Sequence, residues 1–240
     1  MSTCITVDGL TKSYAGRTVV DHLSFTVQKG EVFGLLGHNG AGKSTTIELL
    51  LGLKKPEQGK ATILEMEPEA NRKKLFERVG VQFQSSNYQC NIRVDEACQE
   101  RALLYAHPAD YRELLRQFGI GHLEKSPVNK LSGGEKQKLS VVLALVGKPE
   151  IVFLDELTTG LDVAARHEVW RTLKGLKEKG LTIFLTTHYM EEAENLCDHL
   201  CLIKNGRKVA EGTVQEIVAK SPYDNLENAY LWYMDEEVAL

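Results

Sequence analysis

The stretch GHNGAGKST, residues 37–45, decides the fold of this chain. It follows the apolar run EVFGLLG at 31–37 and leads into a helical pattern over Lys43–Leu51. Three glycines in six positions make a poor helix or strand interior. The stretch matches G-x-x-x-x-G-K-[ST], in which glycines let backbone N–H groups point at phosphate oxygens and the following helix adds its positive end. The sequence therefore predicts a phosphate-binding loop between a strand and a helix.

The loop supplies several candidate ligands for a nucleotide. We expect Lys43 to reach the β- and γ-phosphates and the Ser44 hydroxyl to take one position on an octahedral Mg²⁺ ion. The alternative is a chance glycine turn, but the flanking strand and helix favour the phosphate loop. The expected nucleotide-binding residues of the loop are Gly37, Asn39, Gly40, Ala41, Gly42, Lys43, Ser44 and Thr45.

A second motif, IVFLDE at 151–156, ends an apolar run in two acids. Such a run is typical of a buried parallel strand, and ligands of these folds bind at the carboxyl ends of the strands. We expect Asp155 to hold Mg²⁺, through water, and Glu156 to orient or deprotonate the water that attacks the γ-phosphate. Two acids after a strand could also cap the next turn, but the presence of Lys43 favours catalysis.

A third motif, LSGGE at 131–135, precedes the helical pattern KQKLSVVLALVG. The Ser132 hydroxyl and the Gly134 N–H lie where the positive end of that helix would bind an anion. An ordinary helix N-cap with flexible glycines is the alternative.

The three motifs, in this order and spacing, resemble the nucleotide-binding domain of ABC ATPases over about residues 5–220. The resemblance implies ATP and Mg²⁺ as cofactors. It implies that Tyr14 in LTKSY stacks on adenine and that Gln84 in VGVQFQ senses Mg²⁺ and water. It also implies that Asp162 in TGLD communicates across a dimer and that His188 in LTTHY contacts the γ-phosphate. Taken singly, each of the four could be an ordinary structural residue.

Three positions depart from the family pattern. His38 stands where Pro or Ser is frequent, and Leu157 replaces the proline that usually follows the two acids. Lys138 stands where Arg is commoner, so a single ammonium charge replaces a guanidinium that could donate two parallel hydrogen bonds. Neither His38 nor Leu157 removes a phosphate ligand, and Asp155, Glu156 and His188 are all present, so we predict an active ATPase site.

Short apolar runs alternate with helical patterns, which indicates an α/β fold with a mainly parallel sheet. Between about residues 87 and 130 strand signals vanish and helical patterns take over, which predicts an inserted helical subdomain. The resemblance refines the rest to a P-loop NTPase core with an antiparallel β subdomain. That domain is expected to span residues 1–220, and the tail at 221–240 to be helical. Asn205-Gly206 predicts a hairpin. The expected strands are Ile5–Val7, Leu23–Val27, Glu31–Leu36, Ala61–Leu64, Val79–Phe83, Ile151–Leu154 and Thr182–Thr186.

Composition limits the partners and the compartment. The net charge is −4, from 29 basic and 33 acidic residues, which argues against nucleic acid as a partner. Five scattered cysteines without a C-x-x-C pair favour a reduced, cytosolic compartment. The sequence lacks a run of about 18 apolar residues, so we expect a soluble chain that reaches the membrane through a partner.

The resemblance implies that each ATP lies between the phosphate loop of one chain and Ser132 of another, which is a second copy or a paralogous ABC ATPase. Our main hypothesis is an ATPase subunit, peripheral on the cytoplasmic face of the cell membrane, that powers a separate integral membrane permease. Residues 185–213 resemble ATPase subunits of exporters for drugs, antibiotics or lipids. The alternatives are a soluble ABC ATPase in a non-transport role such as iron–sulfur cluster assembly, and a phosphate-loop kinase or GTPase.

Overall fold

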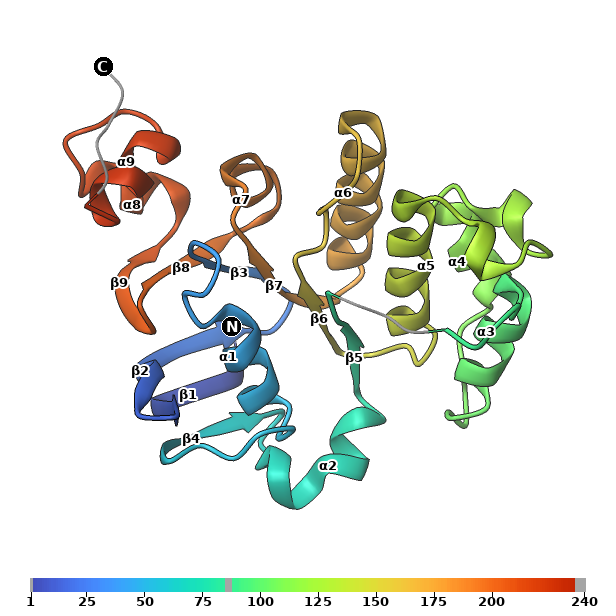
Figure 1. Ribbon diagram of the computed structural model, residues 1–240, viewed down its shortest axis with the longest axis horizontal. Helices are drawn as coiled ribbons and strands as arrows, with labels where there is room; N and C mark the ends of the chain where they lie inside the picture. Colours follow the sequence, from blue (N-terminus) through green and yellow to red (C-terminus); the bar gives the residue numbers. More distant parts are fainter. Residues whose placement is uncertain (1, 85–87, 236–240) are drawn as a thin grey trace. The chain divides into compact units, whose positions relative to one another are not determined.

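The computed structural model describes residues 2–84 and 88–235, and the chain divides into two compact units (Figure 1). Unit 1 combines Met1–Leu75 with Phe184–Leu240, and unit 2 is Phe76–Ile183. The phosphate loop and the tail belong to unit 1. The two acids after IVFL and the LSGGE motif belong to unit 2.

Unit 1 contains an antiparallel sheet in the order β2-β1-β4. Its strands are β1 (Thr3–Tyr14), β2 (Arg17–Gln28) and β4 (Gln58–Ile63). Strands β1 and β2 are much longer than expected from their apolar runs. Register shifts between Val7 and Leu10 carry β1 past Gly9, and Ala15 and Gly16 both have positive φ, as two-residue hairpin turns require.

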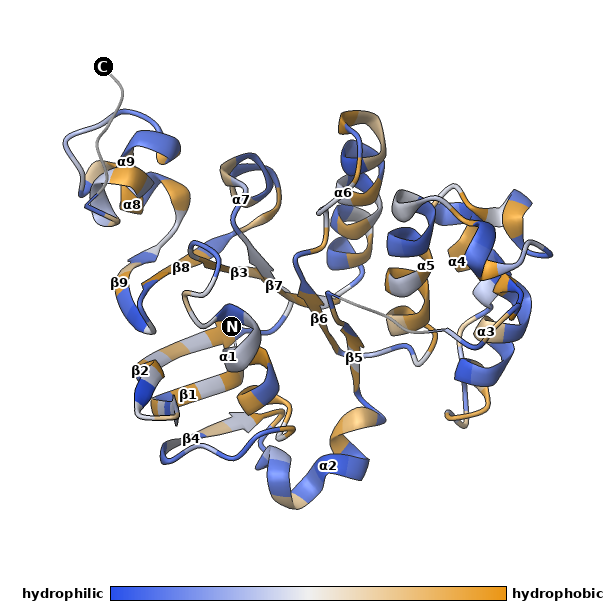
Figure 2. Cartoon of the chain, viewed as in Figure 1, coloured by the Kyte–Doolittle hydropathy of each residue, from blue (hydrophilic) through white to orange (hydrophobic). Residues whose placement is uncertain are grey.

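A second sheet contributes four neighbouring strands, in the spatial order β7 (Thr182–Thr187), β3 (Val32–Leu36), β8 (His199–Lys204) and β9 (Arg207–Gly212). Strand β7 begins two residues before the unit boundary. Strand β3 runs parallel to β8, and β9 returns antiparallel to β8 through the predicted hairpin turn at Asn205-Gly206. All five residues of β3 are buried, and Figure 2 colours the strand as hydrophobic.

The helices of unit 1 are α1 (Lys43–Leu50), α2 (Pro68–Phe76), α7 (Met190–Leu196), α8 (Val214–Ala219) and α9 (Leu226–Tyr233). Helix α2 ends at the unit boundary. In α9, Leu226 and Tyr230 are buried in a cluster with Leu200 and Leu202 of β8. The tail at 221–240 therefore contains a helix that packs on the sheet, while its last residues, 236–240, lie outside the described part.

Unit 2 pairs β5 (Val79–Gln82) in parallel with β6 (Ile151–Asp155). Between them the chain forms α3 (Val94–Ala102), α4 (Tyr111–Gln117), 3-10 turns at Gly121–Leu123 and Val128–Lys130, and α5 (Gly133–Leu145). Helix α6 (Val163–Glu178) follows β6. The expected helical insertion at 87–130 starts at Asn87, outside the described residues, so its extent stays a prediction.

The expected α/β class is confirmed. Parallel pairs β3–β8 and β5–β6 occur beside the antiparallel sheet β2-β1-β4, and helices connect the strands. Within residues 2–84 and 88–235, no helix combines the length and the apolar character needed to cross a membrane.

Candidate nucleotide site

The phosphate loop lies between the end of β3 and the start of α1. Gly40 and Gly42 have φ of 82° and 106°, a region that side chains disfavour. A Cβ on Gly42 would lie 2.5 Å from the carbonyl oxygen of Val19. A Cβ on Gly37 would lie 2.6 Å from the carbonyl oxygen of Ile203. The glycines therefore let the loop approach β2 and β8 closely.

The β8–β9 turn supports this loop from outside. Gly206 N–H donates to the Ala41 carbonyl at 3.0 Å, and Asp21 N–H donates to the Gly206 carbonyl at 3.0 Å. Arg207 Nε adds an ion pair with Asp21 Oδ2 at 2.6 Å. The sequence identified Asn205-Gly206 as a hairpin but gave no signal for its contact with the loop.

Lys43 lies inside the loop and is 4% exposed. Its Nζ donates to the Gly37 carbonyl at 2.8 Å and to the His38 carbonyl at 3.2 Å. Helix α1 begins at Gly42 without a side-chain cap, and its first turn contains no acidic residue. A buried ammonium and a first helical turn without acidic residues suit a polyphosphate. The remaining loop candidates Asn39, Ser44 and Thr45 are exposed or half-buried.

Two other candidates belong to unit 1. Tyr14 ends β1 and is 39% exposed, with Lys54 Nζ and Lys12 Nζ at 4.9 and 5.5 Å from its ring centroid. His188 follows β7 and is half-buried, with its ring centroid 4.1 Å from that of Tyr189. Their contacts with adenine and the γ-phosphate stay predictions.

In unit 2, β6 ends in the two candidate acids. Asp155 and Glu156 are 3% and 9% exposed. Glu156 has φ of 51°, in the left-handed region that is uncommon for residues other than glycine. Gln84 Nε2 donates to Glu156 Oε2 at 2.9 Å. The structure therefore brings together Gln84 and Glu156, which lie 72 residues apart in the sequence.

Two further glutamines contact this turn, and the sequence analysis missed both. Gln82 Nε2 donates to the Phe83 carbonyl at 2.7 Å and to the Asp155 carbonyl at 3.3 Å. Gln137 Nε2 donates to the Leu157 carbonyl at 2.7 Å. Gln82 could have been noticed as a polar residue in an apolar strand. Gln137 gave no signal, because polar residues in the first turns of a helix are ordinary.

Ser132 is the N-cap of α5. Its Oγ accepts from Glu135 N–H at 3.2 Å, and Ser132 N–H donates to Glu135 Oε2 at 2.7 Å, which completes a capping box. This bond from the Ser132 backbone lowers the pKa of the Glu135 carboxyl. Gly134 lies in the first turn, where a Cβ would lie 3.1 Å from Leu161 Cδ2. Ser132 is exposed, so its hydroxyl can reach a ligand.

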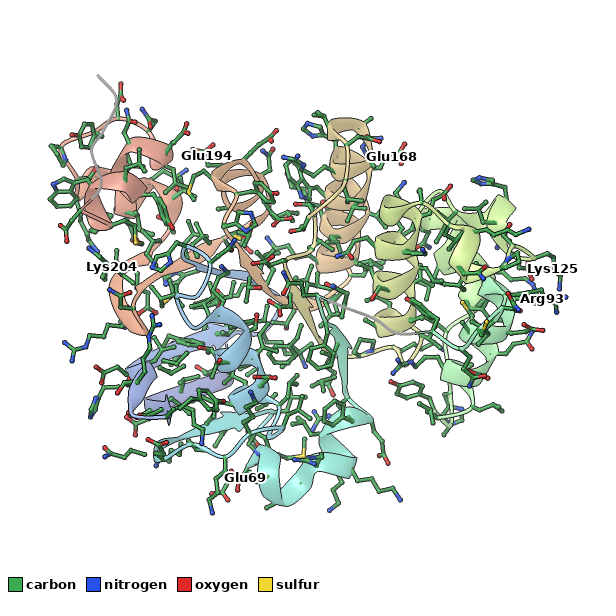
Figure 3. All side chains as sticks on the ribbon, in the orientation of Figure 1. Glu69, Arg93, Lys125, Glu168, Glu194 and Lys204 are labelled. Atoms are coloured by element: carbon green, nitrogen blue, oxygen red, sulfur yellow. The ribbon has the colours of Figure 1, made fainter. Side chains whose placement is uncertain are left out.

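Asp162 is also an N-cap, since its Oδ1 accepts from Ala165 N–H at 2.8 Å at the start of α6. Its communication across a dimer stays a prediction. Lys138, which departs from the family pattern, donates from Nζ to Glu168 Oε2 at 2.8 Å. Glu168 lies on α6 (Figure 3), so Lys138 links α5 to α6 with a single donor.

Comparisons with known proteins identify the family of this chain. A family model described as ABC transporter matches residues 20–159, which include the phosphate loop, LSGGE and LDE. Nod factor export ATP-binding protein I of Ralstonia nicotianae is 42% identical, over 89% of this chain and 68% of that protein. A solved ATP-binding subunit of an ABC transporter is 29% identical with a TM-score of 0.88, over 96% of this chain and 99% of that one.

A second solved structure has the same fold. It is cbiO1 from Clostridium perfringens, described as part of the ABC transporter complex cbiONQ, and it is 28% identical with a TM-score of 0.81. The alignment covers 92% of both chains. This chain belongs to the ABC transporter family, as an ATP-binding subunit that hydrolyses ATP.

Proposed function

We propose that this chain dimerises around two ATP molecules and powers export by a separate membrane permease. The hydrogen bond between Gln84 and the Glu156 carboxylate supports the catalytic part of the proposal, because it joins the expected sensor of Mg²⁺ and water to the expected base. The names of relatives such as the Nod factor export ATP-binding protein of Ralstonia nicotianae support the export direction. The class of the exported compound would be set by the permease.

In the proposed site the phosphate loop holds the triphosphate through its backbone N–H groups. Lys43 Nζ would exchange the carbonyls of Gly37 and His38 for β- and γ-phosphate oxygens. Tyr14 would stack on the adenine, which its exposed ring permits. His188 would contact the γ-phosphate.

The residues expected to hold Mg²⁺ offer a fitting donor set. Ser44, Asp155 and Gln84 supply a hydroxyl, a carboxylate and an amide oxygen, and Mg²⁺ prefers oxygen ligands. Gln84 uses its amide nitrogen toward Glu156, so its oxygen remains for another contact. When bound, the ion would neutralise phosphate charge. Glu156 would orient the attacking water from its position beside Gln84.

Ser132, Gly134 and Asp162 would act on the nucleotide of the second copy or of a paralogous chain. The Ser132 oxygen accepts the Glu135 N–H, so the serine hydroxyl keeps its own hydrogen to donate to a phosphate oxygen. ATP would then hold two chains together, because donors on both sides neutralise its charge, and hydrolysis would loosen the pair.

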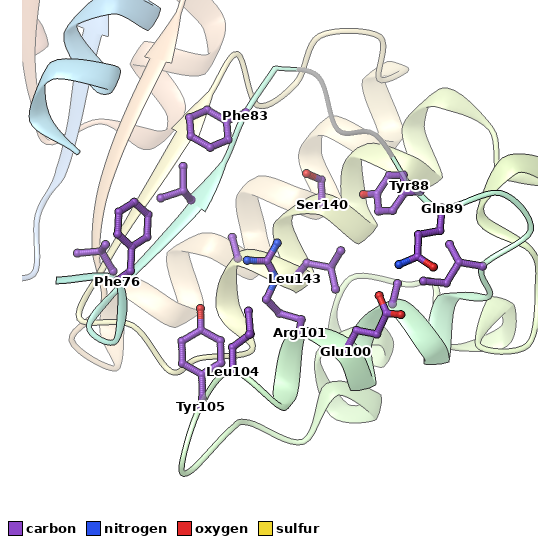
Figure 4. A pocket seen from close by; sticks show the side chains of 15 residues that line it. Phe76, Phe83, Tyr88, Gln89, Glu100, Arg101, Leu104, Tyr105, Ser140 and Leu143 are labelled. Carbon is purple, nitrogen blue, oxygen red and sulfur yellow. The ribbon is translucent and has the colours of Figure 1, made fainter. Parts of the chain in front are cut away.

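A groove in unit 2 supports the permease as the second partner. Its volume is about 530 Å³, and it lies along β5, α3 and α5 (Figure 4). Leu103 and Leu104, directly after α3, are 86% and 68% exposed. Two adjacent leucines with this much exposure to solvent indicate an interaction surface. An amphipathic cytoplasmic helix of the permease would bury them. The lining includes Phe83, Tyr88, Arg101, Leu104, Tyr105 and Leu143.

Glu156→Gln tests the catalytic assignment. We expect turnover to fall by about 10²–10⁴-fold, because the amide cannot accept the proton of the attacking water. ATP binding should persist, and the variant should accumulate as an ATP-bound dimer in size-exclusion chromatography. Glu178→Gln, an exposed acid at the end of α6, is the control. Wild-type hydrolysis by Glu156→Gln would show that the assigned base is wrong.

Membrane association is tested separately. The tagged chain should purify from detergent-solubilised membranes together with an integral protein that has several apolar segments of about 20 residues. Recovery only from the soluble fraction would favour a non-transport ABC ATPase, such as one for iron–sulfur cluster assembly.

A further inference from the structure

Three glutamine amides donate to three consecutive residues, 155–157, at the end of β6. Gln82 donates to the backbone carbonyl of the first at 3.3 Å. Gln84 donates to the side-chain carboxylate of the second at 2.9 Å. Gln137 donates to the backbone carbonyl of the third at 2.7 Å. We refer to Gln82, Gln84 and Gln137 as the glutamine clamp.

The turn that the clamp holds is strained. Glu156 has φ of 51°, and a non-glycine residue in this region is disfavoured and persists only where its surroundings impose it. Gln82 fixes the backbone before Glu156, Gln137 fixes it after, and Gln84 fixes the carboxylate itself. Leu157 is fully buried, so the carbonyl that Gln137 contacts belongs to an anchored residue.

Gln82 is an unexpected residue for its position. Its side chain is 1% exposed, and among the described residues its Oε1 has no hydrogen-bond partner. A buried unsatisfied oxygen is destabilising, and an apolar side chain would avoid that cost. What the glutamine supplies at this site is its amide N–H, which reaches the carbonyls of Phe83 and Asp155.

Gln137 brings a different element into the turn. It lies on α5, five positions after the N-cap Ser132, on the helix that LSGGE opens. A helix moves as a unit over such a short distance. A displacement of Ser132 by a ligand would therefore reach the carbonyl of Leu157, next to Glu156, through Gln137.

We infer that Gln82 and Gln137 are positioning residues for hydrolysis, which hold the backbone on both sides of Glu156 so that its carboxylate faces the attacking water. This inference rests on the proposed role of Glu156. Because Gln137 lies on α5, the position of Glu156 in a chain would also depend on α5 of the same chain. In the proposed dimer, that helix contacts the nucleotide of the other site.

Gln137→Met tests the inference, since methionine keeps the length of the side chain and removes the donor. We expect kcat of the full-length chain to fall by about 10- to 100-fold, because small displacements of a catalytic group have effects of this size. KM for ATP should change by less than about twofold, since no binding contact is lost. Gln82→Met should show the same split between kcat and KM while leaving the melting temperature unchanged or raised.

The matched control is Gln117→Met. Gln117 Nε2 donates to Glu113 Oε1 at 3.0 Å within α4, so this variant makes the same substitution and loses a glutamine hydrogen bond away from residues 155–157. Its kcat should stay at the wild-type value. Thermal melting of all three variants would identify a rate loss that is caused by unfolding.

The double variant of Gln137→Met with Glu156→Gln separates positioning from general stability. Positioning acts through the carboxylate, so single-turnover rates of the double variant and of Glu156→Gln should be equal. Additive losses, or wild-type kcat for Gln137→Met, would overturn the inference. Wild-type turnover by Glu156→Gln alone would instead overturn the proposed site, so the two failures are distinguishable.

Discussion

The two helices that are expected to face phosphate begin in opposite ways. Helix α1 starts at Gly42, with φ of 106°, no side-chain cap and no acidic residue in its first turn. Helix α5 starts at Ser132 with a complete capping box, and its first turn contains Glu135. The sequence motifs suggested similar anion-binding ends, whereas the structure shows one end without a side-chain cap and one with its own cap.

The difference has a physical consequence for each helix. The N-cap Gly42 of α1 provides no side-chain cap, and the first turn of the helix contains no acidic residue, so this end suits an anionic ligand. At α5 the serine and the glutamate satisfy each other's backbone donors without a ligand. Binding at α5 would therefore use the Ser132 hydroxyl and the Gly134 N–H, whereas binding at α1 would use the backbone of the whole loop.

Gly42→Ala should have the largest effect, because it alters the helix that depends on backbone geometry. The positive φ costs about 1–2 kcal/mol. The contact of the new Cβ with the Val19 carbonyl, at 2.5 Å, adds about 1–3 kcal/mol. We expect a loss of roughly 2–5 kcal/mol in urea unfolding, the sum of these two costs, and loss of detectable ATP binding by fluorescence titration.

Gly40→Ala is the matched control for that prediction. Its φ is 82°, but a Cβ there would meet nothing within 4 Å, so only the conformational cost applies. Equal losses for the two variants would mean that the close approach to β2 does not explain the glycine at position 42. The fold near α1 would then tolerate more change than its contacts indicate.

The sequence predicted the parts of the site that are local. Each of the three motifs contains its decisive residues within a few positions, so residue types and spacing were sufficient. The hairpin at Asn205-Gly206 was predicted for the same reason, because its two decisive residues are adjacent. The pattern T-x-x-E at 213–216 would likewise have predicted the start of α8, where Thr213 and Glu216 form a capping box, but the sequence analysis did not include it.

The remaining parts depend on contacts between distant residues. Gln137 donates to a carbonyl 20 residues further along the chain, and Gln82 to one 73 residues away. A backbone carbonyl has no sequence signature, so neither bond could be predicted. Strands β1 and β2 were underestimated for a related reason, because their polar ends are held by pairing with each other rather than by an apolar pattern.

Ser132→Ala should have an intermediate effect and tests the capped helix. Loss of the N-cap costs about 1 kcal/mol in the free energy of unfolding. Thr213→Ala removes the cap of α8 with the same geometry, since its Oγ1 also lies 3.2 Å from the nitrogen three residues later. Both variants should therefore lose similar stability in urea unfolding.

Only Ser132→Ala should also lower ATP turnover, by up to about 10²-fold, as expected when a donor to the transition state is removed. An equal fall in Thr213→Ala would show that the rate follows stability. Ser132 would then be a structural cap, and α5 would lose its proposed contact with the nucleotide.

Glu135→Gln should have the smallest effect and tests whether the cap of α5 depends on charge. The Ser132 backbone N–H lowers the pKa of Glu135, so the carboxylate stabilises the fold above its unfolded-state pKa, and this contribution is lost as the pH falls through the folded-state value. The variant should be less stable than wild type at pH 7 by under about 1 kcal/mol. The difference should shrink below about pH 4, as followed by urea unfolding between pH 7 and pH 3.

The capping box of α8 offers the control for this pH dependence. The Thr213 backbone N–H also lowers the pKa of Glu216. The difference in free energy of unfolding between Glu216→Gln and wild type should therefore become smaller as the pH falls from 7 to 3. The free energy of unfolding of Glu135→Gln could differ from wild type by the same amount at every pH, while that of Glu216→Gln approaches wild type at low pH. This outcome would show that the carboxylate charge does not stabilise the start of α5. The contrast between a self-capped α5 and an uncapped α1 would then rest on the serine alone, because the neutral amide would satisfy the Ser132 backbone donor equally well.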